Sequence, residues 1–245
     1  MKKQILATAM AIVSVGSLNI VTPTAASCKP LEASIIEINE QNESEFTFGI
    51  KDPRMENLMK QVEEQKRKNQ IEAARRAEEK RQLELKKEQE RIDNVKFDSY
   101  DIGNPSGVTH QEMANVLMGS GFEEFSDAFV DAEIAYGVNA FALAAIPGLE
   151  SGWNRSGRAK DGNNNIVGMN VPHNASRGTV YNSKYQCIMD LARQLRTYYL
   201  TPGGSYYNGV STSKVNIKYS ADPNWYTQVD KIGDELMQKY SQLYR

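Results

Sequence analysis

The residue whose type and position best suit catalysis is Glu150, in the sequence Leu-Glu-Ser-Gly-Trp at residues 149–153. It closes an apolar run that begins at Ala140, so its carboxyl is expected at the end of a buried helix. Partial loss of hydration raises the pKa of a carboxyl. A raised pKa keeps a proton available near neutral pH, as a general acid requires. Taken alone, the position is more typical of a helix-terminal glutamate that faces water, so the context must decide.

Two helices are expected ahead of the helix that carries Glu150. Residues 109–112, Thr-His-Gln-Glu, form a capping box that opens a helix to about residue 118. An amphipathic helix is predicted over residues 123–136, and Gly137 ends it. Its candidate core residues are Phe125, Phe129 and Ile134.

The Glu150 helix is expected to start at residue 140, with Asn139 as its N-cap and a kink at Pro147. Residues 151–182 have no helical period, and they predict loops with a short β-hairpin.

The C-terminal part of the chain predicts two further helices. One opens at a capping box in residues 183–186. The other follows Asp222-Pro223, where Asp222 is expected as the N-cap. The result is a mainly α-helical domain over residues 105–245, which is long enough for one hydrophobic core.

The chain ahead of this domain divides into three segments. Residues 1–27 run from basic to apolar to small, which is typical of a secretory signal; a retained membrane anchor and lipidation at Cys28 are the alternatives. Residues 28–53 predict a linker. Residues 54–95 are rich in Glu, Lys and Arg and predict a long exposed helix, a spacer of about 60 Å at ~1.5 Å per residue. Its sparse apolar residues form no coiled-coil seam, so weak self-association is the second interpretation.

The overall composition argues against several classes of partner and cofactor. With 29 Lys plus Arg against 31 Asp plus Glu, the chain lacks the basic excess of a nucleic-acid-binding protein. Two Cys and two His are too few and too scattered for a zinc site, and no phosphate-binding glycine loop is evident. No cofactor is therefore expected. Cys187 is expected to be a buried free thiol, and a disulfide with Cys28 is the alternative.

Several segments together resemble glycoside hydrolase family 73, the bacterial endo-β-N-acetylglucosaminidases. Residues 136–139 (Tyr-Gly-Val-Asn), 144–146 (Ala-Ala-Ile) and 149–153, with Ser156, resemble its catalytic helix. Residues 163–168 (Asn-Asn-Asn-Ile-Val-Gly) resemble its Asn-Asn-Leu-Phe-Gly loop, and residues 219–225 (Tyr-Ser-Ala-Asp-Pro-Asn-Trp) its Tyr-Ala-Thr-Asp-Pro-x-Trp/Tyr motif. The motifs keep the family's order and spacing over residues 107–243.

The resemblance implies an exported enzyme with a lysozyme-like catalytic domain that cleaves β-1,4 bonds in peptidoglycan glycan strands. Glu150 is then the general acid that protonates the glycosidic oxygen. Tyr219 is the active-site tyrosine, which positions the substrate or stabilises the transition state; the alternative is a tyrosine that packs on the last helix. Asn164, Asn165 and Gly168 would shape the loop at the floor of the cleft.

The second catalytic group is not assigned by the resemblance. Most glycosidases use two acids, and between Glu150 and Asp190 this chain has only Asp161. Asp161 is either that second carboxylate or, as we favour, a turn residue in residues 160–163. In the second case the 2-acetamido oxygen of the sugar would replace the protein nucleophile. The loop also departs from the family, because it has Ile-Val where Leu-Phe is usual.

Aromatic residues in the same region suit a sugar cleft, since their rings can stack on pyranose faces. The candidates are Trp153, Tyr198, Tyr199, Tyr206, Tyr207 and Trp225, of which Tyr206 and Tyr207 are expected to be exposed after Gly203-Gly204. Two other functions remain open. One is a lytic transglycosylase or muramidase, although the Gly-Leu-Met-Gln segment usual in transglycosylases is not found. The other is a non-enzymatic wall-binding scaffold.

Overall fold

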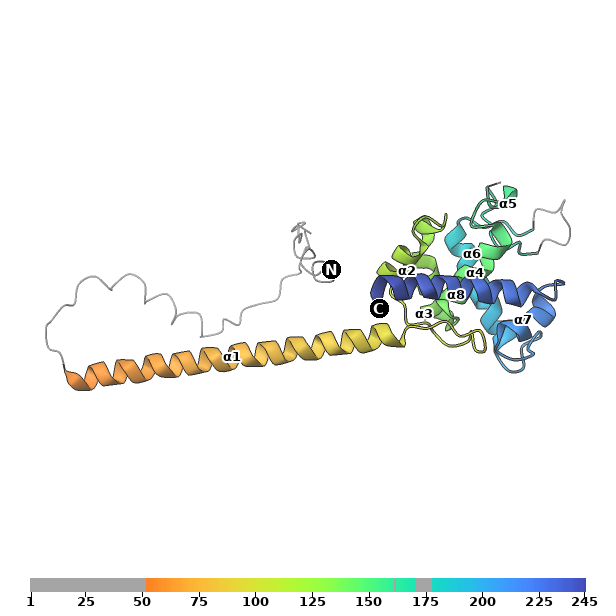
Figure 1. Cartoon of the computed structure of the whole chain (residues 1–245). Coiled ribbons are helices and arrows are strands. Elements are labelled where there is room, and N and C mark those ends of the chain that lie inside the picture. Colours follow the sequence, from red (N-terminus) through yellow and green to blue (C-terminus); the bar gives the residue numbers. More distant parts are fainter. Residues whose placement is uncertain (1–51, 161, 171–177) are drawn as a thin grey trace, which may run out of the picture. The chain divides into compact units, whose positions relative to one another are not determined.

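The computed structural model describes residues 52–160, 162–170 and 178–245 (Figure 1). The predicted signal at 1–27, nearly all of the predicted linker, and Asp161 therefore lie outside the described residues. Within the described ranges all regular elements are helices. No helix in these ranges is both long and apolar enough to cross a membrane. The chain forms two units, Met1–Lys66 and Arg67–Arg245.

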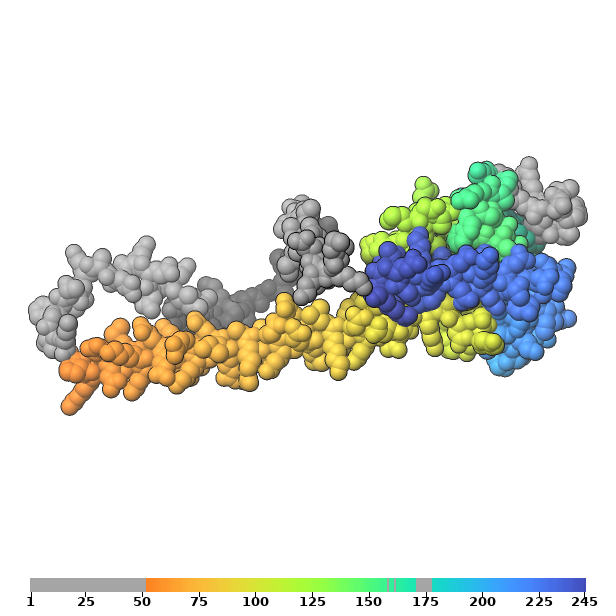
Figure 2. Space-filling model, in the orientation of Figure 1, coloured from red at the N-terminus to blue at the C-terminus, as the bar shows by residue number. Residues whose placement is uncertain are grey.

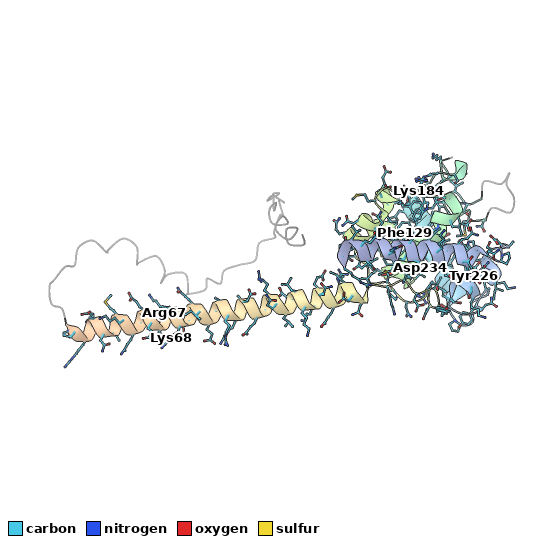
Figure 3. All side chains as sticks on the ribbon, viewed as in Figure 1. Arg67, Lys68, Phe129, Lys184, Tyr226 and Asp234 are labelled. Carbon is cyan, nitrogen blue, oxygen red and sulfur yellow. The ribbon has the colours of Figure 1, made fainter. Side chains whose placement is uncertain are left out.

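Helix α1, Pro53–Asn94, corresponds to the predicted charged helix. Its side chains project on all sides, as Arg67 and Lys68 illustrate (Figure 3), and none of its residues is buried. Ion pairs three or four residues apart run along it, among them Lys60 with Glu56 at 2.9 Å. Each such exposed pair stabilises the helix by roughly 0.2–0.5 kcal/mol. The helix is therefore held by local pairs along its own surface.

The C-terminal end of α1 is bonded to distant parts of the second unit. Arg91 donates two hydrogen bonds to the buried carboxylate of Glu112, at 3.1 and 2.5 Å. The guanidinium of Arg245 donates to three carbonyls at the end of α1, those of Ile92, Asp93 and Val95, over 2.7–3.2 Å. Val95 and Ile102 are buried, so the hydrophobic core begins upstream of residue 105.

The rest of the second unit is a set of short helices around a central apolar one. They are α2 (His110–Leu117), η1 (Glu123–Phe125), α3 (Asp127–Tyr136), α4 (Ala140–Ser151), α5 (Gly157–Lys160), α6 (Lys184–Gln194), η2 (Leu195–Leu200), α7 (Thr212–Tyr219) and α8 (Trp225–Tyr244). Helix α4 is central, because α3, α6 and α8 all pack against it. Figure 2 shows α8, in dark blue, at the surface of this unit.

Local signals fix both ends of the central helix α4. The Asn139 side chain accepts hydrogen bonds from the backbone N–H groups of Phe141 and Ala142, as an N-cap does. Every residue from Ala140 to Gly148 is buried. Near the other end the Ser151 hydroxyl donates to the carbonyl of Pro147 at 2.6 Å. Burial of this apolar segment is what fixes the position of Glu150 at its end.

The prediction for residues 109–136 is confirmed in outline, with one wrong core residue. Thr109 and Glu112 make both bonds of the capping box, and Gly137 ends α3 at φ 65°. Ser126 separates η1 from α3, so the expected single helix is two short ones. Ile134 is 73% exposed, because it lies on the face of α3 directed away from the core.

Three other expectations differ from the structure. The β-hairpin predicted within residues 151–182 is not found in the described residues. Backbone hydrogen bonds do join this region, from Tyr181 N–H to Asn163 O and from Thr179 N–H to Met169 O, both at 2.9 Å. Positive φ at Asn164, Gly168 and Asn170 is incompatible with an extended strand.

Asp222 is not the N-cap of α8. Asn224 holds that position without a side-chain bond, and Asp222 instead accepts from the Asn224 N–H at 2.9 Å in the preceding turn. Helix α7, over Thr212–Tyr219, was not among the predicted helices.

Candidate active site

Glu150 lies at the mouth of a cleft of about 370 Å³. One wall consists of residues 167–170, which belong to the loop at residues 163–170 (the Asn loop). Another wall is formed by α6 and η2, with Gln194 and Tyr199. Tyr219, at the end of α7, closes the third side. The cleft is formed by elements far apart in the sequence, which the helix packing around α4 brings together.

A second hollow, of about 280 Å³, adjoins Glu150 and is lined by residues 156–157 and by the Asn loop. Glu150 and Gly168 belong to the lining of both hollows. At Gly168, φ is +67°, a conformation that glycine adopts without strain, and a Cβ there would meet no atom within 4 Å. Glycine therefore leaves the space open where the two hollows meet. The carboxyl thus has room for a substrate on both sides.

Two opposing effects act on the pKa of Glu150. Its side chain is exposed to solvent through the cleft, but the surrounding walls displace much of the water around its carboxyl. This desolvation raises the pKa, and a hydrogen bond from Trp225 lowers it without cancelling the effect. The net result is a carboxyl that retains its proton to higher pH than an ordinary glutamate, as expected from its place in the sequence.

Trp225 is the hydrogen-bond partner of the acid. Its indole Nε1–H donates to Glu150 Oε1 at 2.9 Å, and its side chain is 3% exposed. Predicted as a sugar-stacking residue, it lies instead behind the acid, at the first turn of α8. Sequence reasoning did not identify this bond, although a buried tryptophan N–H usually finds an acceptor.

Tyr219 lies between Trp225 and the cleft. The two rings are 4.7 Å apart between centroids, and Tyr219 lines the cleft together with Glu150. Burial, and then the negative charge of Glu150, hold the pKa of Tyr219 well above its usual value. Its hydroxyl therefore stays protonated over the physiological range and can donate a hydrogen bond.

The Asn loop, residues 163–170, is closed by its own side chains. Asn165 is buried, accepts from the Met169 N–H at 2.8 Å and donates to the Met169 carbonyl at 2.9 Å. Asn164, at φ 54°, donates to the carbonyl of Tyr181 at 2.9 Å. Asn165 and Gly168 line the hollows, whereas Asn164 ties the loop to the chain that returns at residue 181.

Helix α6 contacts the Asn loop, and also Tyr181, to which Asn164 is hydrogen-bonded. Asp190 accepts from the Tyr181 hydroxyl at 2.7 Å and from Gln194, a cleft residue, at 2.9 Å. Cys187, one turn earlier, is a free buried thiol, as predicted, and burial raises its pKa to about 11. The same helix face therefore holds the loop and places Gln194 in the cleft.

The turn after Glu150 directs Trp153 away from the cleft. Gly152, Trp153 and Asn154 all have positive φ, between 57° and 64°, a left-handed turn that is costly for the two non-glycine residues. The Trp153 ring packs on Phe122 at 5.1 Å and lines a separate hollow between α2 and α8. The structure thus does not place Trp153 with the other candidate substrate contacts.

Tyr206 and Tyr207 are exposed, as expected, at 45% and 37%. They belong to the loop after η2, and the Tyr206 ring lies 5.1 Å from that of the cleft residue Tyr199. Asp161 lies outside the described residues.

Comparison with known proteins connects these features to a family. Residues 126–239 match the glucosaminidase family model, described as mannosyl-glycoprotein endo-beta-N-acetylglucosaminidase. Two putative endo-beta-N-acetylglucosaminidases from strains of Streptococcus pneumoniae are each 25% identical in an alignment of 173 residues, which covers 64% of this chain. The chain spans only 26% and 24% of the lengths of these relatives.

Among solved structures, autolysin E of S. aureus, in complex with the disaccharide NAG-NAM, aligns with a TM-score of 0.48 and 21% identity. That alignment covers 63% of this chain and 77% of autolysin E. The catalytic domain of the autolysin Auto from Listeria monocytogenes aligns at 0.37 and 20% identity, over 53% of this chain and 86% of that one. The family match confirms the resemblance seen in the motifs over residues 126–239, the part of this chain that matches the glucosaminidase family model.

Proposed function

We propose that this chain is an exported peptidoglycan hydrolase that cleaves β-1,4 bonds within glycan strands as an endo-β-N-acetylglucosaminidase. The observation that carries the proposal is the setting of Glu150. Its carboxyl, with a raised pKa, lies between two adjoining hollows and is held by Trp225. A polymer that enters through one hollow and leaves through the other would place its linkage at the acid, as endo-cleavage requires.

In the first step Glu150 donates its proton to the glycosidic oxygen while the bond to the sugar C1 breaks. The Trp225 N–H then stabilises the carboxylate that forms, because it already donates to Glu150 Oε1. The protonated Tyr219 hydroxyl lies in the same cleft and can hydrogen-bond the sugar as charge develops at C1.

The group that completes the displacement is open between three candidates: Asp161, Tyr219 and the sugar's own 2-acetamido oxygen. Among the described residues that line the two hollows, Glu150 is the only acid. Asp161 lies outside the described residues, so all three candidates stay open; in the last case the 2-acetamido oxygen would attack C1 before water completes hydrolysis. A substrate in the cell wall also requires export, and the basic-apolar-small pattern of residues 1–27 suits that route.

The test uses the full chain and purified peptidoglycan, with reductive labelling and mass spectrometry of the products. Reducing-end N-acetylglucosamine is expected. A 1,6-anhydro-muramic product would identify a lytic transglycosylase, reducing-end muramic acid a muramidase, and an inert wild-type protein a scaffold.

The assignment of the acid is tested in the same assay by Glu150→Gln, which keeps the shape of the side chain but cannot transfer a proton. The rate is expected to fall by about 10²–10⁴-fold. Glu124→Gln, at an exposed site on η1, is the matched control and should leave the rate unchanged. Equal rates for wild type and Glu150→Gln would remove Glu150 from the mechanism.

A further inference from the structure

We infer that a tyrosine platform beside the cleft, made of Tyr198, Tyr199 and Tyr206, binds sugar units of the glycan strand beyond the scissile bond. The enzyme would then act faster on long strands than on short ones. This inference deepens the proposed function and rests on it. The rings of Tyr198 and Tyr199 lie 6.2 and 5.1 Å from that of Tyr206.

The platform continues the aromatic contacts that begin at the acid. From Trp225 and Tyr219 the row passes to Tyr199, whose ring is 5.7 Å from that of Tyr219. It then reaches Tyr206, 5.1 Å from Tyr199. Tyr199 lines the cleft that contains Glu150, whereas Tyr206 is exposed. The row therefore leads from the acid out of the cleft to the surface.

The platform is held in place by backbone contacts. Tyr198 and Tyr199 lie in η2, a π-helix, a rare form that occurs mostly as a single turn within an α-helix and frequently at functional sites. The following loop folds back on it, and the Tyr206 N–H donates to the Tyr198 carbonyl at 2.9 Å. A Cβ at Gly204 would lie 2.6 Å from that carbonyl oxygen, so this close return requires glycine. A backbone held in this way, with rings in mutual contact, loses little conformational entropy on binding.

The chemistry of these side chains matches a neutral sugar polymer. Aromatic rings offer flat apolar faces to the C–H face of a pyranose, and tyrosine hydroxyls can bond to sugar hydroxyls. All three side chains are phenols, which bind through the faces of their rings and through hydrogen bonds. Because the platform is continuous with the cleft, the same strand that passes Glu150 is its natural occupant.

The test measures kcat/KM of the full-length protein on two glycan fragments that carry no stem peptides, a tetrasaccharide and a decasaccharide. Wild type should prefer the longer fragment. Tyr206→Ala should lower kcat/KM for the decasaccharide by roughly three- to tenfold more than for the tetrasaccharide. Tyr206→Phe, which keeps the ring, should restore most of the preference. Tyr185→Ala, an exposed tyrosine on α6 that bonds to Asp131, is the control and should not change it.

A binding measurement separates this inference from the proposed function. In the Glu150→Gln background, calorimetry should show weaker decasaccharide binding when Tyr206 is also replaced by alanine. Unchanged binding, or an equal loss for both fragments, overturns the inference even if wild type hydrolyses peptidoglycan. A Tyr206→Ala protein that changes its oligomeric state instead would show a protein interface and also overturn it. Failure of wild type to cleave any fragment would refute the proposed function itself.

Discussion

The hydrogen bond between Trp225 and Glu150 allows a direct test of how the acid is controlled. Trp225→Phe removes the Nε1–H that donates to Oε1 at 2.9 Å but keeps an aromatic ring beside Tyr219. The bond stabilises the charged carboxylate and so lowers the pKa of Glu150, against the larger effect of desolvation. Its removal should therefore raise the pKa of Glu150 further.

The direction of the change in activity follows from the role of the acid. A general acid is active while protonated, so kcat/KM falls as pH rises through the pKa of Glu150. With a higher pKa, the alkaline limb of the pH–rate profile should move to higher pH. Hydrogen bonds to charged groups contribute about 1.5–3 kcal/mol, and the low end applies because Glu150 is open to solvent. If that energy also orients the carboxyl, kcat/KM at the optimum should fall about tenfold.

The assay is release of reducing ends from purified glycan strands across a pH series, with the melting temperature measured for each protein. Trp153→Phe is the matched control, because that tryptophan packs on Phe122 and makes no bond to Glu150. An alkaline limb that stays in place, or moves to lower pH, in Trp225→Phe would refute the view that Trp225 acts on the titrating acid.

Two further predictions concern the loop and the junction with α1. Asn165→Ala removes both side-chain hydrogen bonds to Met169, so kcat/KM should fall about tenfold with little change in melting temperature. A large fall in melting temperature together with the loss of activity would instead mean a general folding defect. Glu112→Gln breaks the pair with Arg91 and should destabilise the fold by about 3 kcal/mol, a fall of roughly 6–12 °C in melting temperature, without changing the site. Burial alone would raise the pKa of Glu112, but its hydrogen bonds to Arg91 and Thr109 lower it. The difference in stability between variant and wild type should therefore hold at neutral pH and disappear as pH falls below 4.5. Thermal melts across a pH series measure this difference.

Features set by neighbouring residues could be predicted from the sequence. The capping box at Thr109, the N-cap at Asn139 and the left-handed Gly137 all depend on groups within four residues. The position of Glu150 after a buried helix could be predicted in the same way, because ten consecutive residues of low polarity must lie at the centre of so small a domain. The order of the motifs along the chain then indicates that Tyr219 and the Asn loop belong to the same site.

Features that depend on packing could not be predicted in the same way. The bond from Trp225 to Glu150 joins residues 75 positions apart, and the motif that contains Trp225 does not indicate which way its ring points. The π-helix η2 directly follows α6, and no residue in the sequence marks the change from one helix type to the other. The nearby contact is the return of the following loop to Tyr198, which the local sequence does not indicate. Ile134 failed as a core residue because a helix of ten residues leaves its buried face ambiguous when both faces carry apolar side chains.

The junction at the end of α1 separates two boundaries that are often assumed to coincide. The segment that matches the family model starts at residue 126, whereas the buried core starts at Val95, about thirty residues earlier. A fragment cut at the homology boundary would leave the Glu133 carboxylate without the N–H donors of Ser106 and Gly107. It would also leave Arg245 without its carbonyl acceptors. The unit to transfer in protein engineering is therefore the helical domain together with the last turns of α1.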